Sequence, residues 1–279
     1  MRRTICLLSI CAALLMTGVS GTFAQTVPFI TLASTTSTDN SGLFSHILPL
    51  FEADTGIAVR VVAVGTGQAI RLAERGDADV LLVHHQPSEE RFVAEGFGVK
   101  RYDVMFNDFV VVGPKSDPAK IIGHRTAADA FNSIADSRTI FASRGDNSGT
   151  HKAELSLWQA AGVNVSKFSG IWYREVGAGM GATLNIAAGM GAYTMVDRAT
   201  WVRFKNKGVH RILLEGDPVL FNQYGVIAVS PKHHAHIKAG SAAIFVNWLV
   251  AAKGQAAIAG FKVAGQQLFT PNAASAASN

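Results

Sequence analysis

Apolar runs and amphipathic stretches alternate along the first third of the chain. The apolar runs have the length of buried strands and lie at residues 29–33, 59–64 and 78–83. Helical spacing or helix-favouring composition follows each run, at residues 43–51, 68–75 and 88–95. Gly56 and Gly76 predict helix ends, and Pro87 predicts a helix start. Strands that alternate with helices at this pace predict an α/β fold with a largely parallel sheet.

The same alternation continues in the second half of the chain. The helix expected at 151–161 has Leu155 and Trp158 on its predicted buried side. The other expected elements are a strand at 139–142 and helices at 126–134, 236–252 and 255–259.

Two segments of similar sequence predict a two-lobed organisation. Residues 107–115 and 222–232 each form an apolar strand closed by a small residue, a proline and a lysine. Such a pair suits a chain that crosses twice between lobes. Residues 25–106 and 222–279 would then form the first lobe, residues 107–221 the second, and the two crossings a hinge.

The first 24 residues have the pattern of a secretory signal peptide. Arg2 and Arg3 precede an apolar stretch at residues 5–16, and Ala24 is a small residue suited to cleavage before Gln25. The apolar stretch is too short to span a bilayer comfortably. We therefore expect export to the periplasm.

Both cysteines, Cys6 and Cys11, lie in this leader, so we expect no disulfide or thiol chemistry in the mature protein. Ile10 is too bulky for a lipid-attachment box before Cys11, which favours a soluble protein. Loss of the leader lowers the 25 basic side chains to 23 against 20 acidic ones, a net charge of +3. This mild excess contains no long basic run and argues against nucleic-acid binding.

Three segments combine a strand end, a stretch rich in hydroxyl residues and glycine, and a helix start. They lie at residues 33–42, 64–69 and 142–151. A helix start presents unpaired backbone N–H groups and the positive end of the helix dipole. Glycine lets the backbone approach a ligand closely, and Ser and Thr add uncharged donors. Three such starts, two from one lobe and one from the other, could enclose a small anion.

Helix capping is the ordinary explanation of one such loop. The first loop exceeds that need, because residues 34–38 are five consecutive hydroxyl residues. The third loop places Arg144 beside a glycine, and its planar fork of donors suits an oxyanion. The alternative role of Arg144 is an ion pair with Asp146. Both roles hold if the carboxylate aims the arginine.

Together with neighbouring segments, these loops resemble the periplasmic tungstate-binding proteins of ABC importers. The likeness runs in order over residues 31–269 and is carried by stretches 32–43, 63–69, 76–84, 107–114, 143–151 and 191–200. The family's first loop usually reads Thr-Thr-Thr-Ser. Here it reads Ser34-Thr35-Thr36-Ser37, which loses one methyl group and keeps the hydroxyl.

This resemblance implies two α/β lobes of the type II periplasmic binding-protein fold, each a mostly parallel sheet flanked by helices, with tungstate in the cleft between them. Molybdate is the near alternative, followed by phosphate or sulfate. No cofactor and no protein-ligated metal cation is expected. The expected oxyanion-binding residues are Ser34, Thr35, Thr36, Ser37, Thr66, Gly67, Ser143, Arg144, Gly149, Thr150, Tyr193 and Thr194.

Tungstate is a full dianion at neutral pH, so its site needs donors and no proton acceptor. Phosphate still carries a proton at pH 7 and calls for a carboxylate. Asp39 and Asp146 could serve, but we expect them to organise the loops and Arg144 instead. Lobe closure would bury the anion and present a joint surface to the permease of an ABC transporter, a role that suits a monomer.

The sequence gives weaker support to other classes of function. Residues 146–149 have a distant likeness to a serine-protease nucleophile motif, but Asn147 replaces the expected glycine and no His–Asp partner follows. His233, His234 and His236 could suggest a metal, yet no Cys or carboxylate completes a ligand set. A periplasmic hydrolase and a surface-interaction module therefore remain as alternatives to an anion-binding protein.

Overall fold

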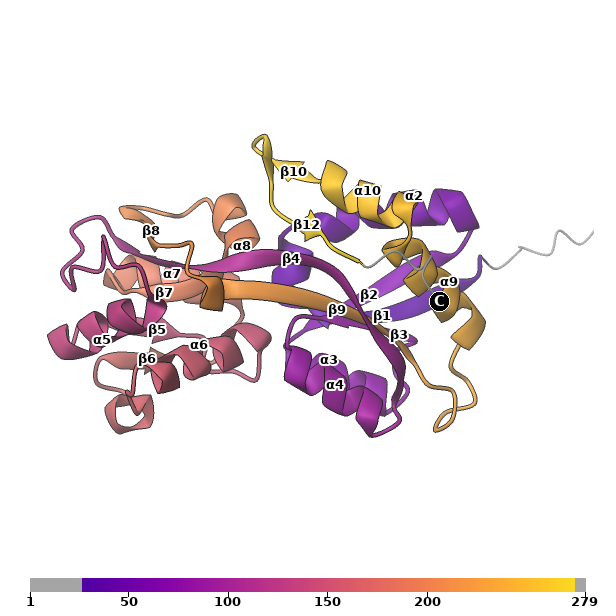
Figure 1. Cartoon of the computed structure of the whole chain (residues 1–279), viewed down its shortest axis with the longest axis horizontal. Coiled ribbons are helices and arrows are strands. Elements are labelled where there is room, and N and C mark those ends of the chain that lie inside the picture. Colours follow the sequence, from indigo (N-terminus) through magenta and orange to yellow (C-terminus); the bar gives the residue numbers. More distant parts are fainter. Residues whose placement is uncertain (1–26, 274–279) are drawn as a thin grey trace, which may run out of the picture.

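The computed structural model describes residues 27–273, so the expected signal peptide lies outside the described residues. The chain forms two α/β lobes that lie side by side and are joined by two long strands (Figure 1). These strands are β4 (Gly98–Pro114) and β9 (Phe221–Val229). The two-lobed arrangement agrees with the expected fold class.

The first lobe is built around β1 (Phe29–Thr35), which pairs in parallel with β2 (Ala58–Val64) and β3 (Val80–Val83). The strand order in this sheet is β12-β4-β9-β3-β1-β2, with β12 at Thr270–Pro271. The helices of this lobe are α1 (Thr36–Asn40), α2 (Leu43–Thr55), α3 (Thr66–Glu74), α4 (Gln86–Ala94), α9 (Ala239–Val250) and α10 (Ala252–Gly260). The short strands β10 (Lys262–Val263) and β11 (Gln266–Gln267) form a separate hairpin.

The second lobe contains the C-terminal end of β4 together with β7 (Thr194–Asp197) and β8 (His210–Leu214), both antiparallel to β4. A small parallel pair, β5 (Phe141–Ser143) and β6 (Tyr173–Glu175), lies beside β7. Its helices are α5 (Ala127–Ser137), α6 (Gly149–Ala160), α7 (Met180–Met190) and α8 (Arg198–Arg203), with short 3₁₀ turns at Val165–Phe168 and Pro218–Leu220.

The expectation of a mostly parallel sheet in each lobe needs correction. Strands β1, β2 and β3 are parallel, but β9 runs antiparallel to both β3 and β4. The two strands that cross between the lobes run in opposite directions, because the chain leaves the first lobe on one and returns on the other. The sheet is therefore mixed.

The two segments of similar sequence form these crossing strands and pair with each other. Asn107 of β4 lies directly opposite Asn222 of β9 in the antiparallel ladder. The buried apolar residues separate on either side of this pair. Those of the first lobe surround Phe51 and Phe245, and those of the second surround Phe131 and Trp158. Ala199 of α8 is an exception, since it packs into the core of the first lobe.

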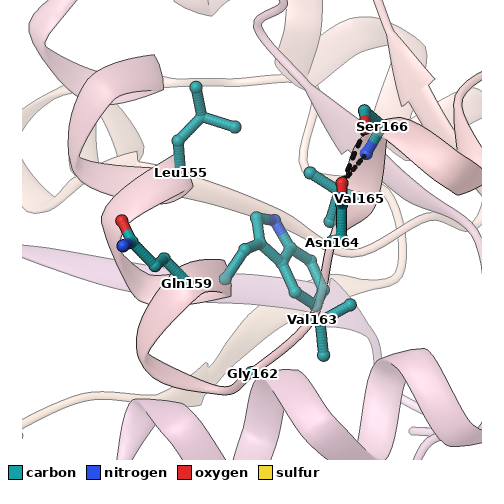
Figure 2. A pocket seen from close by; sticks show the side chains of 8 residues that line it. Leu155, Gln159, Gly162, Val163, Asn164, Val165 and Ser166 are labelled. Carbon is teal, nitrogen blue, oxygen red and sulfur yellow. Dashed lines mark hydrogen bonds between the residues drawn. The ribbon is translucent and has the colours of Figure 1, made fainter.

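One expected core residue lies at the surface. Trp158 is buried, but Leu155 is 39% exposed. Helix α6 turns Glu154, Leu157 and Trp158 inward, so the buried stripe passes one position before Leu155. Leu155 instead lines a groove beside the loop at residues 162–166 (Figure 2). This groove shares no residue with the expected anion site.

No single helix between residues 27 and 273 has both the length and the apolarity to cross a membrane. Helices α9 and α10 meet both criteria only when they are taken together, and the chain bends by 61° between these two helices.

Candidate anion-binding site

Helix starts from both lobes meet where the two lobes touch. Helix α3 starts after β2, and its N-cap residue Gly65 makes no side-chain cap hydrogen bond. Helix α6 starts after β5 and is capped by Ser148, whose hydroxyl accepts from the His151 N–H. The hydroxyl-rich residues 34–38 span the end of β1 and the start of the short helix α1. Each of the three predicted segments therefore leads into a helix start.

Two hydrogen bonds join these starts across the cleft. The backbone N–H of Gly149 donates to Thr66 Oγ1 over 2.9 Å, and the N–H of Gly67 donates to the Asn147 carbonyl over 3.0 Å. The approach at Gly67 is close, because a Cβ added there would lie 2.3 Å from Asn147 Nδ2. The lobes are thus closed, and the Gly67 N–H is used between the lobes.

Three donors at this junction are buried and have no hydrogen-bond partner in the described part of the chain. They are Thr36 Oγ1, Arg144 Nε and Thr150 Oγ1. The side chain of Arg144 is 3% exposed and that of Thr150 is 1% exposed. Thr66 accepts the Gly149 N–H, which uses a lone pair and not the hydroxyl hydrogen. Because buried donors nearly always have acceptors, these groups define a place for an acceptor-rich ligand.

Arg144 is aimed by its neighbour Asp146. Arg144 Nη2 forms an ion pair with Asp146 Oδ2, and Asp146 Oδ1 accepts the Ser148 N–H over 3.2 Å. The carboxylate therefore organises both the arginine and the start of α6, which is the role expected from the sequence. Asp39, the other candidate acceptor, is exposed.

The remaining hydroxyls of the first loop are engaged inside the first lobe. Ser34 donates to the Leu82 carbonyl over 2.6 Å, which ties β1 to β3. Thr35 Oγ1 accepts the Thr38 N–H and lies 3.0 Å from Ser37 Oγ. Ser37 Oγ in turn lies 3.2 Å from His84 Nε2. These side chains shape the loop rather than leave their oxygens unpartnered.

Two expected contacts from the second lobe differ from Thr150 because their hydroxyl hydrogens are donated within the lobe. The Ser143 hydroxyl donates to Glu154 Oε2 over 2.8 Å, so its hydrogen is used within the lobe. The Tyr193 hydroxyl donates to Asp117 Oδ1 over 2.8 Å and packs in the core of the second lobe. Thr194 is buried at the first position of β7. The structure does not bring the Tyr193 hydroxyl to the unpartnered donors.

Sequence reasoning missed a fourth helix start. The N-cap residue of α7 is Gly179, which makes no side-chain cap hydrogen bond, and a Cβ added there would lie 4.0 Å from Thr36 Oγ1. This segment has no hydroxyl residue of the kind that marked the other loops. Its signal was the glycine pair Gly177 and Gly179 before an apolar helical stretch, which resembles Gly65 and Gly67 at the start of α3.

From the sequence, His84 and His85 at the end of a strand could face either the cleft or only the loop, and the structure gives His84 a central position. Its ring stacks on Tyr224, and its Nδ1 lies 3.0 Å from Asn222 Oδ1. Burial lowers its pKa to about 4, the bond to Asn222 opposes this shift, and the charge of Arg144 adds to it. His84 is therefore neutral at pH 7. Its place after an apolar strand allowed a position in the cleft but did not identify Ser37, Asn222 or Tyr224 as its partners.

A buried carboxyl lies at the end of β7. Asp197 Oδ1 accepts the Thr200 N–H over 2.9 Å at the start of α8, while Oδ2 has no partner among residues 27–273. Burial raises the pKa of Asp197, and hydrogen bonds from Thr200 and the charge of Arg144 oppose the rise.

The features that suggested catalysis or metal binding have structural partners. The Ser148 hydroxyl is the α6 cap described above. His234 Nε2 and His236 Nε2 lie 2.8 Å from the carbonyls of Glu74 and Gly76 at the end of α3. No group of three or more His, Cys, Asp or Glu side chains in the described ranges could hold a metal ion.

Two α/β lobes joined by two strands, with helix starts and buried donors where the lobes meet, define the class of two-lobed solute-binding proteins. Comparison with known proteins agrees: the profile of the PBP superfamily domain matches residues 20–253. The tungstate-binding protein TupA of Peptoclostridium acidaminophilum is 47% identical over 249 residues, which cover 88% of this chain and 86% of that protein.

Solved structures give the same relationship. The tungstate-binding protein TupA from Desulfovibrio alaskensis G20 has a TM-score of 0.76 and 46% identity, covering 88% of this chain and 100% of that one. The tungstate ABC transporter structure from Geobacter sulfurreducens has a TM-score of 0.76 and 46% identity, and the match covers 84% of this chain and 98% of that one. The chain belongs to the PBP superfamily and, within it, to the family of the tungstate-binding proteins TupA.

Proposed function

We infer that this protein binds tungstate between its lobes in the periplasm and delivers it, as a monomer and without catalysis, to the permease of an ABC transporter. The observation that carries this function is the set of buried, unpartnered donors on Thr36, Arg144 and Thr150. A dianion without a proton supplies acceptors only, which suits such a set. The names of the relatives support tungstate as the anion.

The direct contacts in this proposal are the hydroxyls of Thr36, Thr66 and Thr150, the guanidinium of Arg144, and backbone N–H groups at the helix starts. The two lobes, residues 25–106 with 222–279 and residues 107–221, would open and close about the Asn107–Asn222 pair. Closure would form the Gly149–Thr66 bond and bury the anion. The remaining expected site residues, such as Ser34 and Ser143, would act by shaping the loops.

Calorimetric titration with tungstate, molybdate, sulfate and phosphate tests the proposal. We expect tight tungstate binding, weaker molybdate binding, and none for the other two. Arg144→Ala should weaken tungstate binding at least about tenfold, since a hydrogen bond to a charged group contributes about 1.5–3 kcal/mol. Arg75→Ala is the matched control, because Arg75 also pairs with an aspartate two residues on but is exposed. Preference for phosphate or sulfate would overturn the specificity, and no binding at all would overturn the function.

A further inference from the structure

The first loop and His84 form one line of buried hydrogen bonds. Thr35 Oγ1 lies 2.7 Å from Thr38 Oγ1 and 3.0 Å from Ser37 Oγ. Ser37 Oγ lies 3.2 Å from His84 Nε2. All four side chains are buried, so the line is shielded from solvent.

The line continues from His84 into the hinge. His84 Nδ1 lies 3.0 Å from Asn222 Oδ1, and Asn222 Nδ2 donates to Asn107 Oδ1 over 2.7 Å. Asn107 and Asn222 are direct partners in the ladder that joins the lobes. The side chains of the first loop are thus connected, bond by bond, to the two crossing strands.

The hinge end of the line fixes the tautomer of His84. Asn222 presents its carbonyl oxygen to Nδ1, so Nδ1 must carry a hydrogen. The pKa of about 4 leaves the ring neutral with a single N–H, and Nε2 must therefore accept. Ser37 consequently donates its only hydroxyl hydrogen to His84.

The directions of the other two bonds follow from counting hydrogens. Because the Ser37 hydrogen is used, Thr35 donates to Ser37 Oγ, and Thr38 then donates to Thr35 Oγ1. None of these three hydroxyls has a hydrogen left for a ligand. The buried Thr36 hydroxyl lies outside the line. Among residues 35–38 it is therefore the hydroxyl whose hydrogen is still available to a ligand.

We propose that His84 is a positioning residue for oxyanion binding, which fixes the direction of this hydrogen-bond line and ties the first loop to the hinge. The same ring borders the second lobe, because a Cβ added at Gly149 would lie 3.0 Å from His84 Cε1. His84 therefore contacts the loop, the hinge and the closing lobe at once. This role deepens the proposed function and rests on it.

Two substitutions separate the halves of the line. In His84→Gln the amide oxygen can reach the Nε2 position and accept from Ser37. In His84→Asn the shorter amide stays near the Nδ1 position and can bond only to Asn222. We expect the Gln variant to bind tungstate within about threefold of wild type and the Asn variant about tenfold more weakly, the change produced by one lost buried hydrogen bond.

His210→Gln is the control, since His210 is a buried histidine of the second lobe bonded through Nε2 to the Ala192 carbonyl. It should bind tungstate as wild type does. Equal affinities of the Gln and Asn variants of His84, whether weak or unchanged, would overturn the proposal. A loss of the same size in His210→Gln would do so too.

The direction of these hydrogen bonds can also be measured without tungstate, through the ring nitrogen of His84 that carries the hydrogen. Long-range ¹H–¹⁵N correlation spectra of the unliganded protein at pH 7 should show His84 with a hydrogen on Nδ1 and none on Nε2. A hydrogen on Nε2 would overturn the proposal. If wild type fails to bind tungstate, the proposed function fails, whereas this spectrum still tests the line itself.

Discussion

The backbone N–H of Gly149 donates to the Thr66 hydroxyl over 2.9 Å, from the start of α6 in one lobe to the start of α3 in the other. The bond can exist only when the lobes are closed. It also places the Thr66 oxygen at the junction that holds Thr150 and Arg144. Contacts of this kind make closure sensitive to single atoms at the helix starts.

Gly149→Ala should impair closure. A Cβ there would lie 2.9 Å from Thr66 Oγ1 and 3.0 Å from His84 Cε1, and both neighbours are buried and held by hydrogen bonds. We expect tungstate affinity to fall about tenfold, because overpacking of this kind costs about 1–3 kcal/mol. Small-angle X-ray scattering should show less compaction on adding tungstate than in wild type.

Gly189→Ala is the control for that change. Gly189 lies inside α7 with nothing within 4 Å of an added Cβ. Replacing an interior helical glycine by alanine should raise the free energy of unfolding by about 0.5–1 kcal/mol and leave binding unchanged. Full compaction of the Gly149 variant with tungstate would contradict the closure argument.

Thr36→Val should weaken tungstate binding at least about tenfold, because it replaces an unpartnered buried hydroxyl by a methyl group of similar size. Thr36→Ser should retain most of the affinity, since the hydroxyl is kept. Calorimetry on the two variants compares them directly. Equal weakening in both would mean that the shape of the side chain, and not its hydroxyl, matters at this position.

Asp197→Asn should stabilise the unliganded protein at neutral pH. Burial raises the pKa of Asp197 in the folded state, so folding holds a proton that the unfolded chain loses. Its contribution to stability therefore falls as pH rises above the unfolded-state pKa of about 3.9. Asparagine carries no charge and still accepts the Thr200 N–H, so the gain should vanish towards low pH.

Thermal melts of wild type and Asp197→Asn between pH 4 and pH 8 check this sign. A variant that is less stable than wild type at pH 8 would show that the ionised carboxylate is favourable in the fold.

Tyr173→Phe should lower the free energy of unfolding by about 1.5–3 kcal/mol, the contribution of a hydrogen bond to a charged group. The Tyr173 hydroxyl donates to Glu154 Oε1 over 2.8 Å, and Glu154 also accepts from Ser143 and Trp158. Urea unfolding measures the loss. Tyr102→Phe, a partly buried tyrosine on β4, should change little, and an equal loss there would contradict the assignment.

Much of the local structure follows from sequence because it depends on near neighbours. Helix α2 runs to Thr55 and ends at Gly56 in the left-handed conformation, as the glycine predicted. The helices after residues 64 and 142 start within two positions of the expected ones. The like segments at 107–115 and 222–232 indicated the two crossings, although not that the strands pair antiparallel, since pairing joins residues far apart in sequence.

The composition of the loops indicated an anion site, because hydroxyls, glycines and an arginine at helix starts are chemistry that sequence displays directly. Which of those hydroxyls remain free is a different question. Ser37, Ser143 and Tyr193 carry the same groups as Thr36 and Thr150, yet they are hydrogen-bonded to His84, Glu154 and Asp117. Only the tertiary structure decided this division, because a hydroxyl has one hydrogen and its acceptor is brought to it by the fold.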